Sequence, residues 1–138
     1  MRYIVWSIIA LVSYSFVSPL VSFVTEEIPS QVAVAITNSM LVVMALGVIV
    51  YTETPVVTYL THPRSPYLYV AGVFLGIGII AFYRALALGP VSSVVPIYGM
   101  FIVTSSIIGF LFLEESFTLQ KGVGIAFGIV AIYLVSTG

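Results

Sequence analysis

The amino-acid sequence predicts an all-α, polytopic membrane protein, a bundle of five transmembrane helices. Of its 138 residues, 61% are hydrophobic and only 7% are charged, whereas about 25% of the residues in an average soluble domain are charged. The apolar residues form successive runs, each close to the ~20 residues that a helix needs to cross a bilayer. We therefore expect one transmembrane domain over residues 1–138, with helices at about 3–24, 31–51, 67–88, 91–113 and 119–135.

The composition excludes several other classes of protein. Four Lys and Arg against five Asp and Glu leave no basic surface for nucleic acid. With no cysteine and with His62 as its one histidine, the chain lacks the ligands of thiolate or multi-histidine metal sites, and we expect no metal and no cofactor. Motifs of zinc proteases and serine hydrolases are absent from the sequence, so we do not expect an enzyme. The first apolar run should be retained as a span, because the sequence stays apolar to its end.

The expected helix at 3–24 carries a stripe of hydroxyl side chains that includes Ser15 and Ser18. At ~100° per residue, the stripe covers about a third of the helix circumference. Two interpretations stay open: small hydroxyls that let helices pack closely, or a face that contacts a solute. Pro19 should kink this helix, because it removes the donor to the carbonyl of Ser15.

The expected helix at 31–51 has one strongly polar side chain, Asn38. An amide at membrane depth either bonds to a neighbouring helix or contacts a solute. Residues 51–66 should form a loop, because three prolines punctuate them and their charged side chains cannot lie in lipid cheaply. His62 is then a solvated loop residue.

Glycines recur at a spacing of four on two of the expected helices, as Gly72 and Gly76 and again as Gly124 and Gly128. This spacing allows two helix backbones to approach closely. The partner helix could belong to the same chain or to a second copy.

The expected helix at 91–113 begins with Ser92 and Ser93 and contains Pro96. The proline ring should clash with the carbonyl of Ser92 and leave that acceptor without its helical partner. In lipid such a group needs another partner, so the pattern favours either a kink beside a wet cavity or an ordinary kink satisfied by neighbours.

The few basic residues predict an orientation in the membrane. Arg2, Arg64 and Lys121 fall on one side of a five-span topology. The positive-inside rule then places the N-terminus in the cytoplasm, and we expect a plasma-membrane protein. Arg84 is the exception, near the opposite end of its helix. It either extends to the membrane interface or lies at the outer mouth of a pathway.

Several stretches of the sequence resemble an EamA-type domain of the drug/metabolite transporter superfamily. The end of the third helix and the start of the fourth resemble that family through Phe82-Tyr83-Arg84-Ala85-Leu86, then Gly89-Pro90-Val91-Ser92 and Pro96. The resemblance continues through Leu113-Glu114-Glu115 and through Gly122, Gly124 and Gly128. The first half of the chain matches more loosely, through Trp6 and Pro29.

This resemblance implies a transporter subunit. Members of the superfamily are usually built from two five-helix units, so a single unit implies a homodimer or a paired homologous subunit, surrounded by membrane lipid. We expect it to move a neutral or zwitterionic small-molecule solute. The candidate path residues are Ser15, Ser18, Asn38, Arg84, Ser92, Ser93, Pro96 and Tyr98. The alternative is a non-transporting scaffold or accessory subunit.

Overall fold

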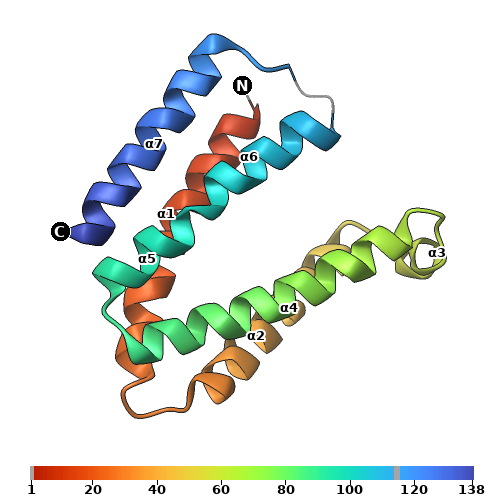
Figure 1. The fold of residues 1–138 in the computed structure, drawn as a ribbon. Coiled ribbons are helices and arrows are strands. Elements are labelled where there is room, and N and C mark those ends of the chain that lie inside the picture. The colour runs from red at the N-terminus through yellow and green to blue at the C-terminus, as the bar shows by residue number, and fades with distance from the viewer. Residues whose placement is uncertain (1, 114–115) are drawn as a thin grey trace. The chain divides into compact units, whose positions relative to one another are not determined.

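The computed structural model describes residues 2–113 and 116–138, which form α-helices joined by short connections (Figure 1). No strand forms within these two ranges. The helices are α1 (Arg2–Val24), α2 (Ser30–Tyr51), α3 (Val56–Leu60), α4 (Ser65–Leu88), α5 (Val91–Gly99), α6 (Phe101–Phe112) and α7 (Leu119–Thr137). Five spans are long and apolar enough to cross a membrane, with α5 and α6 together making the fourth, Val91–Phe112. The predicted all-α, five-span fold is confirmed.

Prolines determine where two of the spans begin. Pro29 and Pro90 directly precede α2 and α5, with extended ψ angles of 135° and 143°. Each proline carbonyl accepts the first bonds of its helix, as when Pro90 accepts from the backbone N–H groups of Ser93 and Val94. The predicted boundaries of all five spans lie within two residues of those observed.

The C-terminus of α2 is closed by a Schellman motif. Glu53 has a left-handed φ of 53°, and its backbone N–H donates to the carbonyl of Val50 at 3.3 Å. The N–H of Thr54 reaches back to the carbonyl of Ile49 at 3.1 Å. These are the two bonds of that motif, in which glycine usually occupies the left-handed position.

The segment that we expected to be a loop, residues 51–66, contains the short helix α3. Two side chains of α4 satisfy its terminal carbonyls: Ser65 Oγ donates to Tyr59 O at 2.5 Å and Tyr69 Oη to Leu60 O at 2.7 Å. A single helical turn is marginal by itself, so these bonds explain why it forms here.

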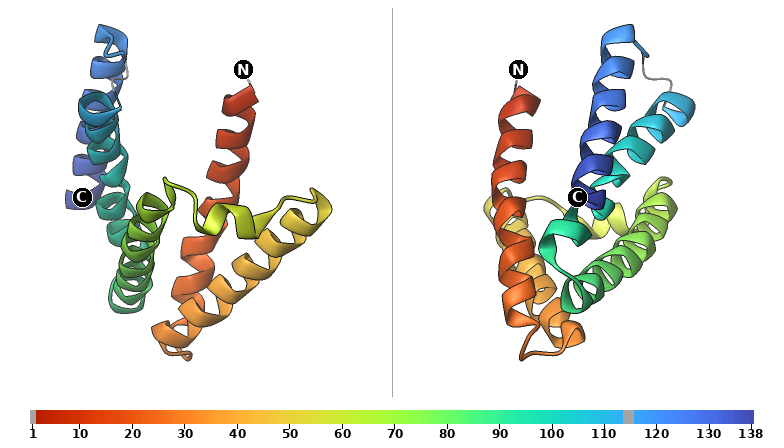
Figure 2. Two further views of the ribbon diagram at one scale, coloured as in Figure 1. Left: turned by 90° about the vertical axis from the view of Figure 1, so that its right-hand side faces the viewer. Right: turned by 60° about the vertical axis from the view of Figure 1, so that its left-hand side comes forward.

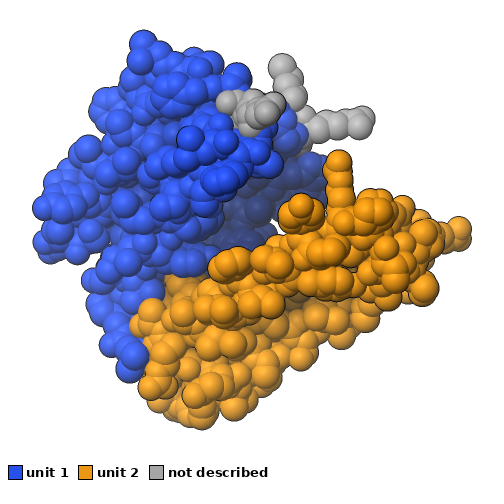
Figure 3. Space-filling model, turned by 45° about the vertical axis from the view of Figure 1, so that its right-hand side comes forward, with its two compact units in different colours: residues 1–19, 88–138 blue, residues 20–87 orange. Residues whose placement is uncertain are grey.

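The chain divides into two compact units, residues 1–19 with 88–138 and residues 20–87 (Figure 3). In the first unit, α7 packs mainly against α5 and runs back along α5 and α6 in the opposite chain direction (Figures 1 and 2). In the second unit, a hydrogen bond between Thr37 and Tyr83 joins α2 to α4. The boundary within α1 follows Pro19 directly, and α1 continues through that proline as one helix.

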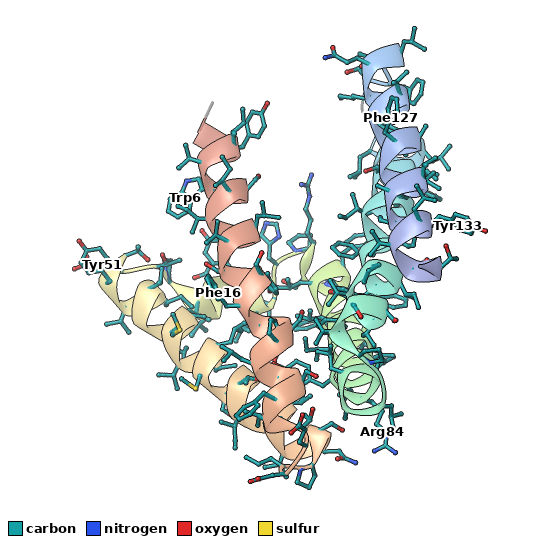
Figure 4. The ribbon with its side chains drawn as sticks, turned by 90° about the vertical axis from the view of Figure 1, so that its left-hand side faces the viewer. Trp6, Phe16, Tyr51, Arg84, Phe127 and Tyr133 are labelled. Carbon is teal, nitrogen blue, oxygen red and sulfur yellow. The ribbon has the colours of Figure 1, made fainter. Side chains whose placement is uncertain are left out.

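Most large apolar side chains lie on the surface. Figure 4 shows examples such as Trp6 and Tyr133 projecting away from the helices. Among the described residues the buried apolar side chains are Val21, Ala33, Phe82, Tyr83, Leu86 and Val103. Water would penalise such extensive apolar exposure, whereas the hydrocarbon core of a bilayer accepts it.

Candidate functional site

A pair of hydroxyl groups forms a polar contact between α2 and α4. Thr37 Oγ1 lies 2.9 Å from Tyr83 Oη, and Tyr83 is only 3% exposed. Thr37 also donates to the carbonyl of Ala33 at 2.9 Å. Because a threonine hydroxyl has one proton, this geometry assigns Tyr83 as the donor to Thr37. The pair lies about 10 Å along α2 from its first residue, at membrane depth.

Asn38 and Ser15 bond to their own helices. Asn38 Nδ2 donates to the carbonyl of Val34 at 2.9 Å, and Ser15 Oγ donates to that of Leu11 at 2.8 Å. These bonds satisfy the hydroxyl donor of Ser15 and one amide donor of Asn38 without a neighbouring helix. Asn38 is half-buried and Ser15 exposed, whereas Ser18 is buried. The bond from α2 to a neighbouring helix, which we considered for Asn38, is made by the adjacent Thr37.

Arg84 is exposed and projects outward near the end of α4 (Figure 4). Its neighbour Tyr83 is buried. The two side chains can differ in this way because consecutive residues of a helix point about 100° apart. Arg84 precedes the last residue of α4, Leu88, by one turn. Its guanidinium can therefore reach the membrane interface, where the negative end of the helix dipole also favours a cation.

Four candidate residues lie together on α5: Ser92, Ser93, Pro96 and Tyr98. Ser93 and Pro96 are half-buried, whereas Ser92 and Tyr98 are exposed. The rings of Tyr98 and Phe101 lie 5.0 Å apart, in a tilted arrangement that spans the break between α5 and α6.

The helix break does not coincide with Pro96. Helix α5 continues through the proline, and the interruption comes at Met100, whose backbone N–H donates to Ile97 O, three residues back, at 3.2 Å. Such a bond marks a locally tightened turn. Gly99 precedes it and lies against α7, where an added Cβ would be 3.9 Å from Ile132 Cδ1. The irregularity of this span therefore lies at Gly99-Met100.

An open groove of about 550 Å³ runs between α6 and α7. Val103, Ser106 and Phe110 line it from α6; Lys121, Gly124 and Gly128 line it from α7. Lys121 Nζ donates to the carbonyl of Ser116 at 2.9 Å and lies 5.8 Å from the centre of the Phe110 ring. Sequence reasoning did not find this groove, because it depends on how α6 and α7 pack.

The four glycines at a spacing of four do not pack closely in the described part of the chain. A Cβ added to Gly72, Gly76, Gly124 or Gly128 would meet no described heavy atom within 4 Å, apart from neighbouring residues and the helix backbone. Their role in close helix packing therefore stays a prediction. Glu114 and Glu115, which contributed to the family resemblance, lie outside the described residues.

The sequence matches one known protein family over almost its whole length. The sequence profile of the EamA-like transporter family matches residues 1–137. The chain belongs to the EamA-like transporter family. This result confirms the resemblance and makes the protein a membrane protein of the drug/metabolite transporter type. Neither curated proteins nor solved structures give a significant match to it.

The polar groups that the EamA-like chain presents at membrane depth form hydrogen bonds. Among its described residues, no group of three or more His, Cys, Asp or Glu side chains could hold a metal ion. Hydroxyls, an amide and backbone carbonyls at membrane depth can bind polar solutes by hydrogen bonds. Sequence reasoning missed the Thr37–Tyr83 pair, although a tyrosine in an apolar span generally needs a hydroxyl partner.

Proposed function

We propose that this EamA-like chain is a subunit of a small-metabolite transporter that moves neutral or zwitterionic solutes. The observation that carries the proposal is the family match over residues 1–137, on a chain with five membrane-spanning helices. The positions of the charged side chains within the spans support a neutral or zwitterionic solute. Arg84 and Lys121 both lie within about one turn of a helix end, which leaves hydroxyl and amide groups deeper in the bilayer.

The α5 segment supplies a backbone acceptor for such a solute. Pro96 has no N–H, so the carbonyl of Ser92 lacks the donor that an α-helix would normally provide four residues later. An unsatisfied carbonyl in lipid costs several kcal/mol. A hydroxyl or ammonium group of a passing solute can satisfy it, with Ser92 and Ser93 beside it.

The Thr37–Tyr83 pair supplies a second polar contact. Tyr83 donates to Thr37, which is exposed and keeps a second acceptor lone pair on its oxygen. A solute hydroxyl can donate to that lone pair without breaking the bond between α2 and α4. Asn38 follows Thr37 in α2 and adds an amide to the same unit.

The transporter is proposed to act as a homodimer or with a homologous subunit. The space beside Gly72 and Gly76 in α4 supports this assembly, because a second helix can approach there without displacing a side chain. We also propose a plasma-membrane location with a cytoplasmic N-terminus. Arg2 begins α1, Arg64 directly precedes α4 and Lys121 lies near the start of α7, and these three positions share one side of a five-span topology.

Solute flux into liposomes tests the function. Purified protein would be reconstituted and offered a panel of neutral and zwitterionic amino acids and sugars, with dicarboxylates as the charged comparison. We expect saturable uptake of at least one uncharged or zwitterionic solute and none of the dicarboxylates. Correctly inserted protein that gives no flux above protein-free liposomes would refute transport of these solutes and favour the accessory-subunit alternative.

A further inference from the structure

The α6–α7 groove has the length of one leaflet of a bilayer. Its lining on α7 extends from Lys121 to Ile132. These eleven steps at 1.5 Å per residue correspond to about 17 Å, compared with about 15 Å for half of a 30 Å hydrocarbon core. Lys121 is the third residue of α7, so the groove begins near the membrane surface and extends into the apolar layer.

Charge is concentrated at one end of this groove. Apart from Lys121 and Ser106, its lining consists of apolar side chains and glycines. The Lys121 ammonium donates one hydrogen bond, to Ser116 O, and carries three protons in total. The nearby N-terminus of α7 adds the positive end of a helix dipole. An anion at this end and a hydrocarbon chain along the rest would match the groove chemically.

Phe110 lines the charged end of the groove, and Phe117 packs against it. The rings of Phe110 and Phe117 meet edge to face at 5.2 Å. Phe117 also covers Gly122, where an added Cβ would lie only 2.6 Å from Phe117 Cζ. These contacts, together with the position of Lys121 over Phe110, define the end of the groove where a head group would lie.

We propose that this groove binds one anionic phospholipid of the surrounding bilayer, with an acyl chain between α6 and α7 and its phosphate at Lys121. The chemistry of the groove favours a lipid over a helix from a second copy. The groove has a single cation, Lys121, at one end and an almost wholly apolar lining along the rest, which is the charge distribution that an anionic lipid complements. The missing side chains of Gly124 and Gly128 leave space for its acyl chain.

Native mass spectrometry tests the proposal. Delipidated protein would be mixed with equal amounts of phosphatidylglycerol and phosphatidylcholine that carry identical acyl chains. Wild-type protein should retain the anionic lipid about fivefold over the zwitterionic one, as expected for a single lysine near a membrane phosphate. Lys121→Gln should reduce this preference to near one. Equal retention of both lipids by the wild type, or an unchanged preference in Lys121→Gln, would overturn the proposal.

A second variant tests the hydrocarbon part of the groove. Gly124→Leu should fill the groove and lower retention of both lipids, because its Cβ enters open space and leaves the backbone undisturbed. Gly47→Leu is the matched control, since Gly47 is equally open but lies on α2, outside the groove and the proposed pairing surface. Circular dichroism would check that both variants remain helical. Equal lipid retention by the two variants would overturn the proposal.

The same spectra separate lipid from other occupants. A change in the number of chains per complex in Gly124→Leu, with lipid retention intact, would identify the groove as a contact between copies and refute lipid binding there. With palmitate added to the mixture, retention of palmitate but not of phosphatidylglycerol would also refute it, because the occupant would then be a free amphiphile.

Discussion

We predict that removing either hydroxyl of the Thr37–Tyr83 bond lowers the stability of the protein by a different amount. Tyr83→Phe removes a hydroxyl but leaves Thr37 bonded to the carbonyl of Ala33. Thr37→Val instead leaves the hydroxyl of Tyr83, which is 3% exposed, without the acceptor that the structure gives it. We therefore expect Thr37→Val to destabilise the protein more than Tyr83→Phe does.

The magnitudes follow from the membrane setting. Hydrogen bonds between transmembrane helices average about 0.6 kcal/mol in double-mutant cycles, and an unpaired buried group costs about 1–3 kcal/mol. Tyr83→Phe should cost about 0.6 kcal/mol and Thr37→Val about 1–2 kcal/mol in the free energy of unfolding. The double variant should cost less than the sum of the two, because the stranded hydroxyl is then removed as well.

The assay is unfolding in mixed micelles with a denaturing detergent, followed by circular dichroism. Thr37→Ser retains the hydroxyl and serves as one control. Tyr133→Phe, at an exposed tyrosine of α7, serves as the other. Both controls should lie close to wild type. Equal losses in the free energy of unfolding for Thr37→Val and Tyr83→Phe would show that the pair does not act as described. The same conclusion would follow if their effects added without any coupling energy in the double variant.

Three further predictions concern transport, topology and assembly. Pro96→Ala should leave the protein inserted but change the rate or selectivity of solute flux, because residue 96 regains an N–H for the carbonyl of Ser92; unchanged flux would remove Pro96 from the site. Five spans with a cytoplasmic N-terminus place the C-terminus outside, so a C-terminal reporter active only in the cytoplasm would contradict the proposed orientation. Gly76→Leu should weaken pairing of chains in crosslinking experiments, because a leucine fills the open space beside α4. Full-rate transport by a monomer in nanodiscs would count against the proposed assembly.

The spans could be predicted from the sequence because local physics determines them. Apolar length decides where a helix can cross the bilayer, and Pro29 and Pro90 limit where α2 and α5 can begin. The short helix α3 could not be found this way, since its terminal carbonyls depend on Ser65 and Tyr69 of the following helix.

The candidate site was only partly accessible to sequence reasoning. Its polar residues can be recognised one by one, but pairing is not local: Thr37 and Tyr83 are 46 residues apart. The break at Met100 was missed for a different reason. Pro96 gives a clear local signal, whereas the tightened turn follows a glycine that packs against α7. The α6–α7 groove likewise depends on how two helices diverge, which hydrophobic periodicity does not specify.

Glu53, whose backbone adopts a left-handed φ at the end of α2, is a position where a substitution can stabilise the protein. A non-glycine residue in this conformation costs about 1–2 kcal/mol, and a carboxylate beside a helix C-terminus opposes the helix dipole. Glu53→Gly removes both penalties while keeping the two bonds of the Schellman motif. The position lies in the connection between α2 and α3, outside the helices that carry the candidate path residues and the lipid groove. It is therefore a suitable place to raise the melting temperature of the detergent-purified protein without altering the helix faces proposed to bind solute or lipid.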